Sequence, residues 1–189
     1  MYTPNLGSIL IDDTELHQID PAELRFSIGY VPQDVVLFHG SVKNNIVVGA
    51  PYVDDNAVIR AAEIGGLAHF INSHPDGFDR EVGERGAQLS GGQRQSIAIS
   101  RALLLDPPIL VFDEPTNCMD DSTTSAFIRR LQPTINDKTL IIVTHKANVL
   151  QIVDRLIVLD DSGVIADGPR DEVLEQLASG KIKATAHAE

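Results

Sequence analysis

The sequence predicts an α/β fold in which helices cover a parallel sheet. Three apolar runs of strand length, at 28–31, 109–112 and 139–144, are separated by segments with helical periodicity. Strands that alternate with helices are typical of a parallel sheet, and uninterrupted apolar runs indicate strands covered on both faces. The 189 residues are enough for one domain with its own hydrophobic core, and we expect one α/β unit with a helical insertion.

The first half of the chain alternates short strands and short helices. A strand is expected at 8–11, a helical or turn segment at 18–25, and a second strand at 28–31 that Pro32 and Gln33 end. Ser41 is placed to cap a helix through Val48, and Asp54 to cap another through Ile64. Residues 67–73 predict a third short helix.

The segment Leu89–Pro115, LSGGQRQSIAISRALLLDPPILVFDEP, organises the rest of the chain. Ser90 stands at an N-cap position, Gly91 and Gly92 carry no side chain, and a helix follows from Gln93 to Leu105. Its expected apolar positions are Ile97, Ala98, Ala102, Leu104 and Leu105. A helix start of this composition leaves backbone N–H groups free at the positive end of the macrodipole. It therefore predicts a site for a phosphate.

Two adjacent carboxylates, Asp113 and Glu114, end the apolar run at 109–112. Ligands of open α/β sheets bind beyond the carboxyl ends of the strands. An aspartate that holds a metal ion and a glutamate that activates water would be well placed there.

The second half of the chain predicts further regular elements. A helix is expected from Ser122 to Gln132, where Pro133 ends it, and a buried strand at 139–144 with His145 at its carboxyl end. A hairpin is expected from 155–159 and 164–166 around Asp161-Ser162-Gly163, with Gly168-Pro169 stopping it. A last helix, 171–178, precedes a weakly structured tail at 179–189.

Charge and cysteine content exclude several classes of protein. The formal charge of −12 argues against a nucleic-acid surface, which needs clustered Lys and Arg. No apolar run approaches 18 residues and no leader pattern is present, so we expect the chain itself to lie in the cytosol or on a cytosolic face. The single cysteine, Cys118, fits a reducing compartment and no zinc pattern, and it is expected in a loop.

The LSGGQ segment and the apolar strand that ends in DEP resemble the nucleotide-binding domain of an ATP-binding cassette (ABC) transporter, a P-loop NTPase-like fold with an inserted helical subdomain. The resemblance implies ATP and Mg²⁺ as cofactors. It makes Glu114 the general base, Asp113 a magnesium ligand, and His145 the H-switch on the γ-phosphate. Gln33, in V-P-Q-D, matches the Q-loop glutamine near magnesium.

The resemblance also implies a head-to-tail dimer with a second ABC subunit. Ser90, Gly91, Gly92 and Gln93 would contact the ATP of the neighbour, whereas Asp113 and Glu114 serve the ATP of their own subunit. Residues 116–120, TNCMD, occupy the D-loop, whose final Asp120 would act across the dimer interface.

Within the family, the sequence is similar to exporters. Residues 41–105 would form the helical subdomain, and the segment LFHGSVKNNI resembles the exporter surface that grips a transmembrane domain. The segment GERG at 83–86 resembles the X-loop, although by itself it is a surface turn. Together with QIDPAELR and HPDGFD, these segments look most like type I secretion permease/ATPases, relatives of the haemolysin B and large-adhesin exporters. That likeness implies protein secretion from the cytoplasmic face of the inner membrane, with an unfolded cargo of the RTX type.

The P-loop pattern, G-x-x-x-x-G-K-[ST], occurs nowhere in the 189 residues. Since the chain opens on a segment that resembles the stretch after the P-loop helix, we expect a partial ABC ATPase domain, 1–189, that lacks the first strands and the P-loop. The transmembrane domain would be fused upstream. Without the P-loop lysine, the isolated chain is expected to be inactive.

Three alternatives remain beside a type I ATPase. The chain could be a truncated, non-catalytic module that pairs with complete subunits through its LSGGQ face. It could instead belong to an exporter of lipids, peptides or drugs. The LSGGQ-bearing ATPases of chromosome maintenance and DNA repair are disfavoured, because heptad coiled coil and basic surface are absent.

Overall fold

The computed structural model describes residues 4–50, 52–160 and 163–182, in two compact units. The first unit is Met1–Val143 and the second is Thr144–Glu189. The expected tail at 179–189 lies outside the described residues from position 183 on, as do residues 161 and 162 of the expected hairpin turn.

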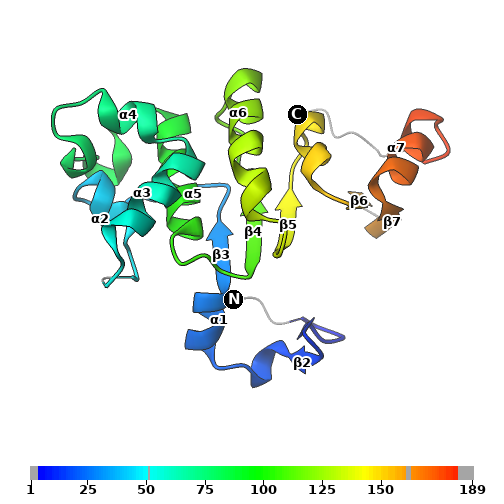
Figure 1. Ribbon diagram of the computed structural model, residues 1–189. Helices are drawn as coiled ribbons and strands as arrows, with labels where there is room; N and C mark the ends of the chain where they lie inside the picture. Colours follow the sequence, from blue (N-terminus) through cyan, green and yellow to red (C-terminus); the bar gives the residue numbers. More distant parts are fainter. Residues whose placement is uncertain (1–3, 51, 161–162, 183–189) are drawn as a thin grey trace. The chain divides into compact units, whose positions relative to one another are not determined.

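A parallel three-stranded sheet, in the order β3-β4-β5, forms the centre of the first unit (Figure 1). Its strands are β3 (Ile28–Val31), β4 (Ile109–Asp113) and β5 (Thr139–Val143). The register aligns Val31 with Phe112, and Phe112 with Ile142. These are the three strands that the apolar runs predict, and their carboxyl ends share one edge of the sheet.

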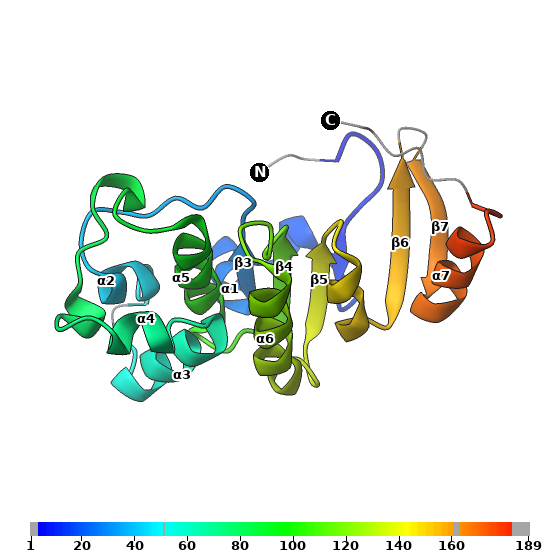
Figure 2. The same cartoon turned by 90° about the horizontal axis from the view of Figure 1, so that it is seen from above.

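The helices α2, α3 and α4 gather around α5 on the side of it away from β5 (Figures 1 and 2). They are α2 (Val42–Ile46), α3 (Asp55–Gly65), α4 (Ala68–Asn72) and α5 (Gly91–Leu103). The side chains of Ser41 and Asp54 cap α2 and α3 as predicted, although α2 ends at Ile46, before the expected Val48. Buried residues from all four helices make one apolar cluster, which includes Val42, Ile46, Val58, Phe70 and Ile97.

The remaining elements of the first unit flank the sheet. They are β1 (Leu10–Ile11), β2 (Thr14–Glu15), α1 (Pro21–Ser27) and α6 (Asp121–Leu131). β1 begins at Leu10 instead of position 8, ends at Ile11 as expected, and pairs with β2 across a turn at Asp12 and Asp13, both of which have positive φ. Short 3-10 turns lie at Leu16–Gln18, Gly77–Asp79, Glu84–Gly86 and Gln132–Thr134.

The side chains on one face of the sheet are more deeply buried than those on the other. Leu110 and Phe112 are fully buried, whereas Val111 is half-buried and Tyr30 and Ile141 are 54% and 53% exposed. The register places Tyr30, Val111 and Ile141 side by side on one face. The expectation of strands covered on both faces is therefore wrong for the described residues: one face is buried at β3 and β4 and half-buried at β5, and the other face leaves apolar side chains exposed.

The second unit holds a hairpin and one helix. A 3-10 segment, Ala147–Ile152, precedes β6 (Arg155–Asp160), β7 (Gly163–Pro169) and α7 (Arg170–Ala178). A bidentate ion pair joins Arg155 to Asp167 across the strands, with both N···O distances at 2.7 Å. The second strand runs three residues beyond its expected end at 166, and the hairpin stops at Gly168-Pro169 as expected, since β7 ends at Pro169 and α7 begins at Arg170.

Candidate functional site

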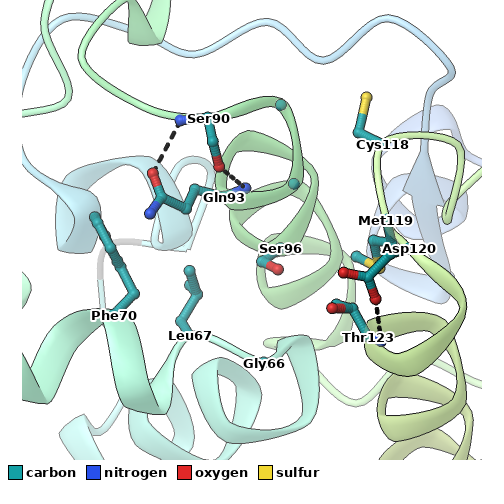
Figure 3. Close-up of a pocket in the computed structure, with 12 residues that line it drawn as sticks. Gly66, Leu67, Phe70, Ser90, Gln93, Ser96, Cys118, Met119, Asp120 and Thr123 are labelled. Atoms are coloured by element: carbon teal, nitrogen blue, oxygen red, sulfur yellow. Dashed lines mark hydrogen bonds between the residues drawn. The ribbon is translucent and has the colours of Figure 1, made fainter.

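The N-terminus of α5 is closed by a reciprocal cap between Ser90 and Gln93. The N–H of Gln93 donates to Ser90 Oγ at 3.2 Å, and the N–H of Ser90 donates to Gln93 Oε1 at 2.9 Å (Figure 3). This is the capping-box arrangement, which satisfies two donors that a helix start leaves open. The N–H groups of Gly91 and Gly92 make no hydrogen bond to any other described residue. They remain available to an anion.

A pocket of about 360 Å³ lies beside this helix start. Ser90 and Gln93 border it from one side, Leu67 and Phe70 from α4 and its N-cap, and Asp120 from the segment before α6 (Figure 3). The full lining is Gly66, Leu67, Phe70, Ser90, Gly91, Gly92, Gln93, Ser96, Cys118, Met119, Asp120 and Thr123. The pocket therefore combines free backbone donors with an apolar wall.

Asp120 has a structural role in addition to its place at the pocket. Its carboxylate caps α6, accepting from the N–H of Thr123 at 2.7 Å and from Ser122 Oγ at 2.8 Å. These hydrogen bonds, the one from the Thr123 N–H first, lower the pKa of Asp120 below its ordinary value. The carboxylate is exposed and ionised at neutral pH, so it presents a negative charge at the pocket rim.

Close packing shapes the pocket at Gly91. A Cβ atom there would lie 3.1 Å from Cys118 Sγ, so the exposed Cys118 sits directly against the start of α5. At Gly92, a Cβ atom would lie 3.2 Å from the carbonyl oxygen of Cys118. The two glycines thus allow the 116–120 segment to approach the helix start.

The carboxylates Asp113 and Glu114 lie at the carboxyl edge of the sheet. Asp113 is the last residue of β4, and the N–H of Glu114 continues the ladder by donating to Val143 O of β5 at 2.9 Å. Glu114 has φ +46°, a left-handed conformation that costs a residue with a side chain about 1 kcal/mol or more. Such strain is found most often where geometry serves function. The side-chain atom Glu114 Oε2 is buried.

Gln33 lies at the same edge of the sheet, just after β3. It is exposed and lies two residues beyond the end of β3, which is parallel to β4 and in register with it. An amide oxygen and the Asp113 carboxylate are hard donors of the kind that Mg²⁺ takes, together with phosphate oxygens. In the described part of the chain, no group of three or more His, Cys, Asp or Glu side chains forms a metal site by itself.

His145 is the second residue of the second unit, two residues beyond β5 in the chain, and it is exposed. The structure thus brings Ser90, Gly91, Gly92, Gln93 and Asp120 around one pocket. It places Gln33, Asp113 and Glu114 at one edge of the sheet.

Several pocket residues escaped the sequence reasoning. Gly66, Leu67 and Phe70 join the pocket from the end of α3 and from α4, and no motif marks them. The only available signal was Gly65-Gly66, since Gly66 caps α3 in the left-handed conformation with φ +88°. Leu105, expected in the apolar face of α5, lies beyond the helix and is 44% exposed.

Comparison with known proteins gives the same family at the level of sequence and of structure. The family model described as "ABC transporter" matches residues 1–117. The exotoxin translocation ATP-binding protein PaxB of Pasteurella aerogenes is 40% identical over 174 residues, which are 92% of this chain and 24% of that protein. The leukotoxin export ATP-binding protein LtxB of Aggregatibacter actinomycetemcomitans is 38% identical, over 92% of this chain and 25% of that protein.

A solved structure, a bacterial Atm1-family ABC exporter with ATP bound, matches with a TM-score of 0.87 and 35% identity, covering 93% of this chain and 31% of that one. The chain spans about a quarter of the length of the toxin-export relatives above. No helix among the described residues is long and apolar enough to span a bilayer. The chain belongs to the ABC transporter family, and its fold is that of an ABC exporter ATPase domain related to the ATP-binding proteins of toxin export.

Proposed function

We propose that this chain supplies ATP-hydrolysing machinery to an ABC exporter of the type I protein secretion kind. The observation that carries the proposal is the capped N-terminus of α5, which borders one pocket together with Asp120. The relatives named for toxin translocation, 38–40% identical over 92% of the chain, support secretion as the process.

One set of residues would serve ATP bound to the chain's own subunit. The Glu114 carboxylate accepts a proton from the attacking water, and His145 donates a hydrogen bond to the γ-phosphate. Asp113 and Gln33 hold Mg²⁺, which offsets phosphate charge when it is bound. The strained backbone at Glu114 supports a role for its carboxylate, since the residue keeps a costly conformation at the carboxyl edge of the sheet.

A second set would serve the ATP of a neighbouring subunit in a head-to-tail dimer. The N–H groups of Gly91 and Gly92 face the phosphate, and the Ser90 hydroxyl can still donate a hydrogen bond to it because Oγ only accepts in the cap. Gln93 holds Ser90 in place through the N–H of Ser90. Asp120 would make the polar contact across the interface.

The partners follow from this arrangement. They are a second ABC subunit and the transmembrane domain of an exporter, at the cytoplasmic face of the inner membrane, with an unfolded protein as cargo. A lipid, peptide or drug exporter would use the same residues, so the cargo class rests on the toxin-export relatives alone.

A second candidate function is a non-catalytic module that pairs with complete subunits. One observation favours it: no lysine of the 189 residues stands in a G-x-x-x-x-G-K-[ST] setting, whereas the LSGGQ side is intact. Such a chain would complete a neighbour's site without hydrolysing ATP at its own.

Complementation in trans tests the shared site. The chain is mixed with a complete ABC subunit from a relative whose LSGGQ serine has been replaced, and magnesium-dependent ATP turnover is measured. We expect turnover to rise with the wild-type chain and not with Ser90→Gly, a change that costs helix stability only a few tenths of a kcal/mol.

Two outcomes would contradict the proposal. If the two chains co-purify but turnover stays flat with the wild-type chain, the N-terminus of α5 does not complete the neighbour's site. The chain alone is expected to show neither turnover nor micromolar ATP binding, and either activity would contradict its dependence on a partner.

A further inference from the structure

Arg101, near the C-terminal end of α5, bonds to a segment 56 residues away. Its Nε donates to the carbonyl oxygen of Asn45 at 2.8 Å, and Nη2 lies 3.4 Å from Asn45 Oδ1. Its guanidinium carbon lies 5.7 Å from the centroid of the Phe38 ring. Burial lowers the pKa of Arg101, and these three contacts are all with neutral groups. The guanidinium is half-buried, and two hydrogen bonds to one residue and the Phe38 ring fix its position.

Asn45, which accepts these hydrogen bonds from Arg101, in turn holds the backbone around Phe38. Asn45 is fully buried, and its Oδ1 accepts from the N–H of Phe38 at 2.8 Å. Its Nδ2 donates to the carbonyl oxygens of Phe38 at 2.9 Å and Ser41 at 3.0 Å. The amide side chain of Asn45 therefore hydrogen-bonds to three backbone groups of this loop.

The loop fixed by Asn45 exposes two apolar side chains. We call residues 36–41 the Phe38 loop. The side chains of Phe38 and Val36 are 54% and 60% exposed, whereas Leu37 between them is buried. The loop thus presents two apolar side chains at the surface while its backbone is held from inside.

The helix that carries Arg101 is clamped on both sides of that residue. A Cβ atom on Gly29 would lie 2.3 Å from the carbonyl oxygen of Ala102, and one on Gly65 would lie 2.2 Å from Ser100 Oγ. Packing this close leaves α5 little freedom to slide against β3 or α3. At about 1.5 Å per residue, Arg101 lies about 16 Å along the axis from Ser90, so one rigid helix joins the pocket to the loop.

We propose that Arg101 is a positioning residue that ties the Phe38 loop to α5, so that a change at the N-terminus of the helix is carried to the exposed loop. The inference rests on the proposed function, in which that N-terminus closes on a neighbour's ATP and a membrane-spanning partner is driven by it. Arg101 itself touches neither the pocket nor the sheet edge that carries Asp113.

The matched pair of variants is Arg101→Met and Arg130→Met. Arg130 makes the same kind of bond, from Nε to the carbonyl oxygen of Ile64 at 3.2 Å, and burial lowers its pKa as well, but it serves α3. Methionine keeps the apolar stem in both cases.

Amide hydrogen exchange on the whole chain gives the first readout. We expect Arg101→Met to speed exchange at Phe38 and in 36–46 by about tenfold, with the amides of α3 unchanged. Arg130→Met should speed exchange at the end of α3 instead. Equal acceleration of both regions in both variants would make Arg101 a general stabiliser and overturn the inference.

Coupling in the membrane complex gives the second readout. With Arg101→Met we expect basal ATP turnover and KM for ATP within about twofold of wild type, while cargo translocated per ATP falls about fivefold or more. Unchanged coupling would overturn the inference. If the wild-type complex shows no ATP turnover, the proposed function fails, whereas the exchange result still decides whether Arg101 holds the loop.

A second substitution covers the case in which Arg101→Met does not fold. Arg101→Lys keeps the charge and the stem but loses the planar two-point contact with Asn45. We expect it to fold and to show the same faster exchange in 36–46. Full protection with lysine would mean that charge alone matters, and it would contradict positioning by the guanidinium.

Discussion

The side chains of Ser90 and Gln93 each accept a hydrogen bond from the other residue's backbone N–H, at 3.2 Å and 2.9 Å. Both residues are therefore committed to the helix start before any ligand arrives. The Ser90 hydroxyl proton and the N–H groups of Gly91 and Gly92 are what this arrangement leaves for a phosphate. Preorganisation of this kind predicts that capping and ligand recognition can be separated by mutation.

The first prediction concerns Ser90. Ser90→Ala should lower the free energy of unfolding by about 1 kcal/mol, whereas Ser90→Gly should lower it by only a few tenths, because glycine is a tolerable N-cap. Urea unfolding measures both. If the hydroxyl also contacts a phosphate, both variants should fail equally to restore ATP turnover to the complete subunit in the complementation experiment, despite their different stabilities. Activity that follows stability would assign Ser90 to capping alone.

The second prediction is a pH dependence that arises from Asp120. Hydrogen bonds from Thr123 and Ser122 lower the pKa of Asp120 in the folded chain. Its contribution to stability is therefore complete above the unfolded-state pKa, about 3.9, and is lost as pH falls through the lower folded-state pKa. Asp120→Asn keeps a capping oxygen but cannot titrate. The difference in thermal midpoint between wild type and Asp120→Asn should thus begin to shrink once the pH falls below about 4.

A control for that titration is Asp120→Ala, which removes the cap at every pH. Its midpoint should lie below that of Asp120→Asn throughout the range, because alanine offers no acceptor to the N–H of Thr123. A constant gap between wild type and Asp120→Asn from pH 3 to pH 7 would show that the carboxylate charge adds nothing to the cap.

The third prediction tests the contact between β3 and α5. Gly29→Ala would bring a Cβ atom to 2.3 Å from the backbone oxygen of Ala102 and 2.8 Å from a methyl group of Leu110. Because backbone cannot yield as a side chain does, we expect a loss of about 3 kcal/mol or more in urea unfolding. Gly168→Ala is the control, since its Cβ would meet Val173 at an ordinary 3.5 Å, and its effect should stay within about 0.5 kcal/mol.

Local chemistry explains which parts of the site the sequence could predict. The cap at Ser90 depends on residues three apart, so the pattern S-x-x-Q is enough to predict it. The carboxyl ends of β3 and β4 meet at one edge because parallel strands run in the same direction, so topology puts both Asp113, at the end of β4, and Gln33, just beyond β3, at that edge. These inferences need only spacing and topology.

Long-range contacts explain what the sequence could not predict. The bond between Arg101 and Asn45 spans 56 residues, and neither residue lies in a pattern that predicts its partner. Leu105 has an apolar side chain at a helical spacing, yet the helix ends at Leu103 and leaves it exposed. The open face of the sheet at Ile141 looks, in sequence, like any buried strand.

The last prediction concerns Glu114 in the membrane complex. Glu114→Gln keeps the size of the side chain, and it leaves the left-handed backbone, at φ +46°, and the bond from its N–H to Val143 O in place. If the carboxylate is the general base, turnover should fall about 10²-fold or more while ATP binding and dimer closure persist. Steady-state hydrolysis and nucleotide retention on the complex measure the two effects separately.

Two comparison variants complete that test. Glu23→Gln, an exposed acid on α1, should leave turnover unchanged, so a fall there would indicate a general effect of lost charge. His145→Ala should also cripple turnover, because its imidazole is proposed to contact the γ-phosphate. If Glu114→Gln hydrolyses ATP at the wild-type rate while Ser90→Gly does not, this chain contributes only the LSGGQ side of the paired site, and the non-catalytic function replaces the enzymatic one.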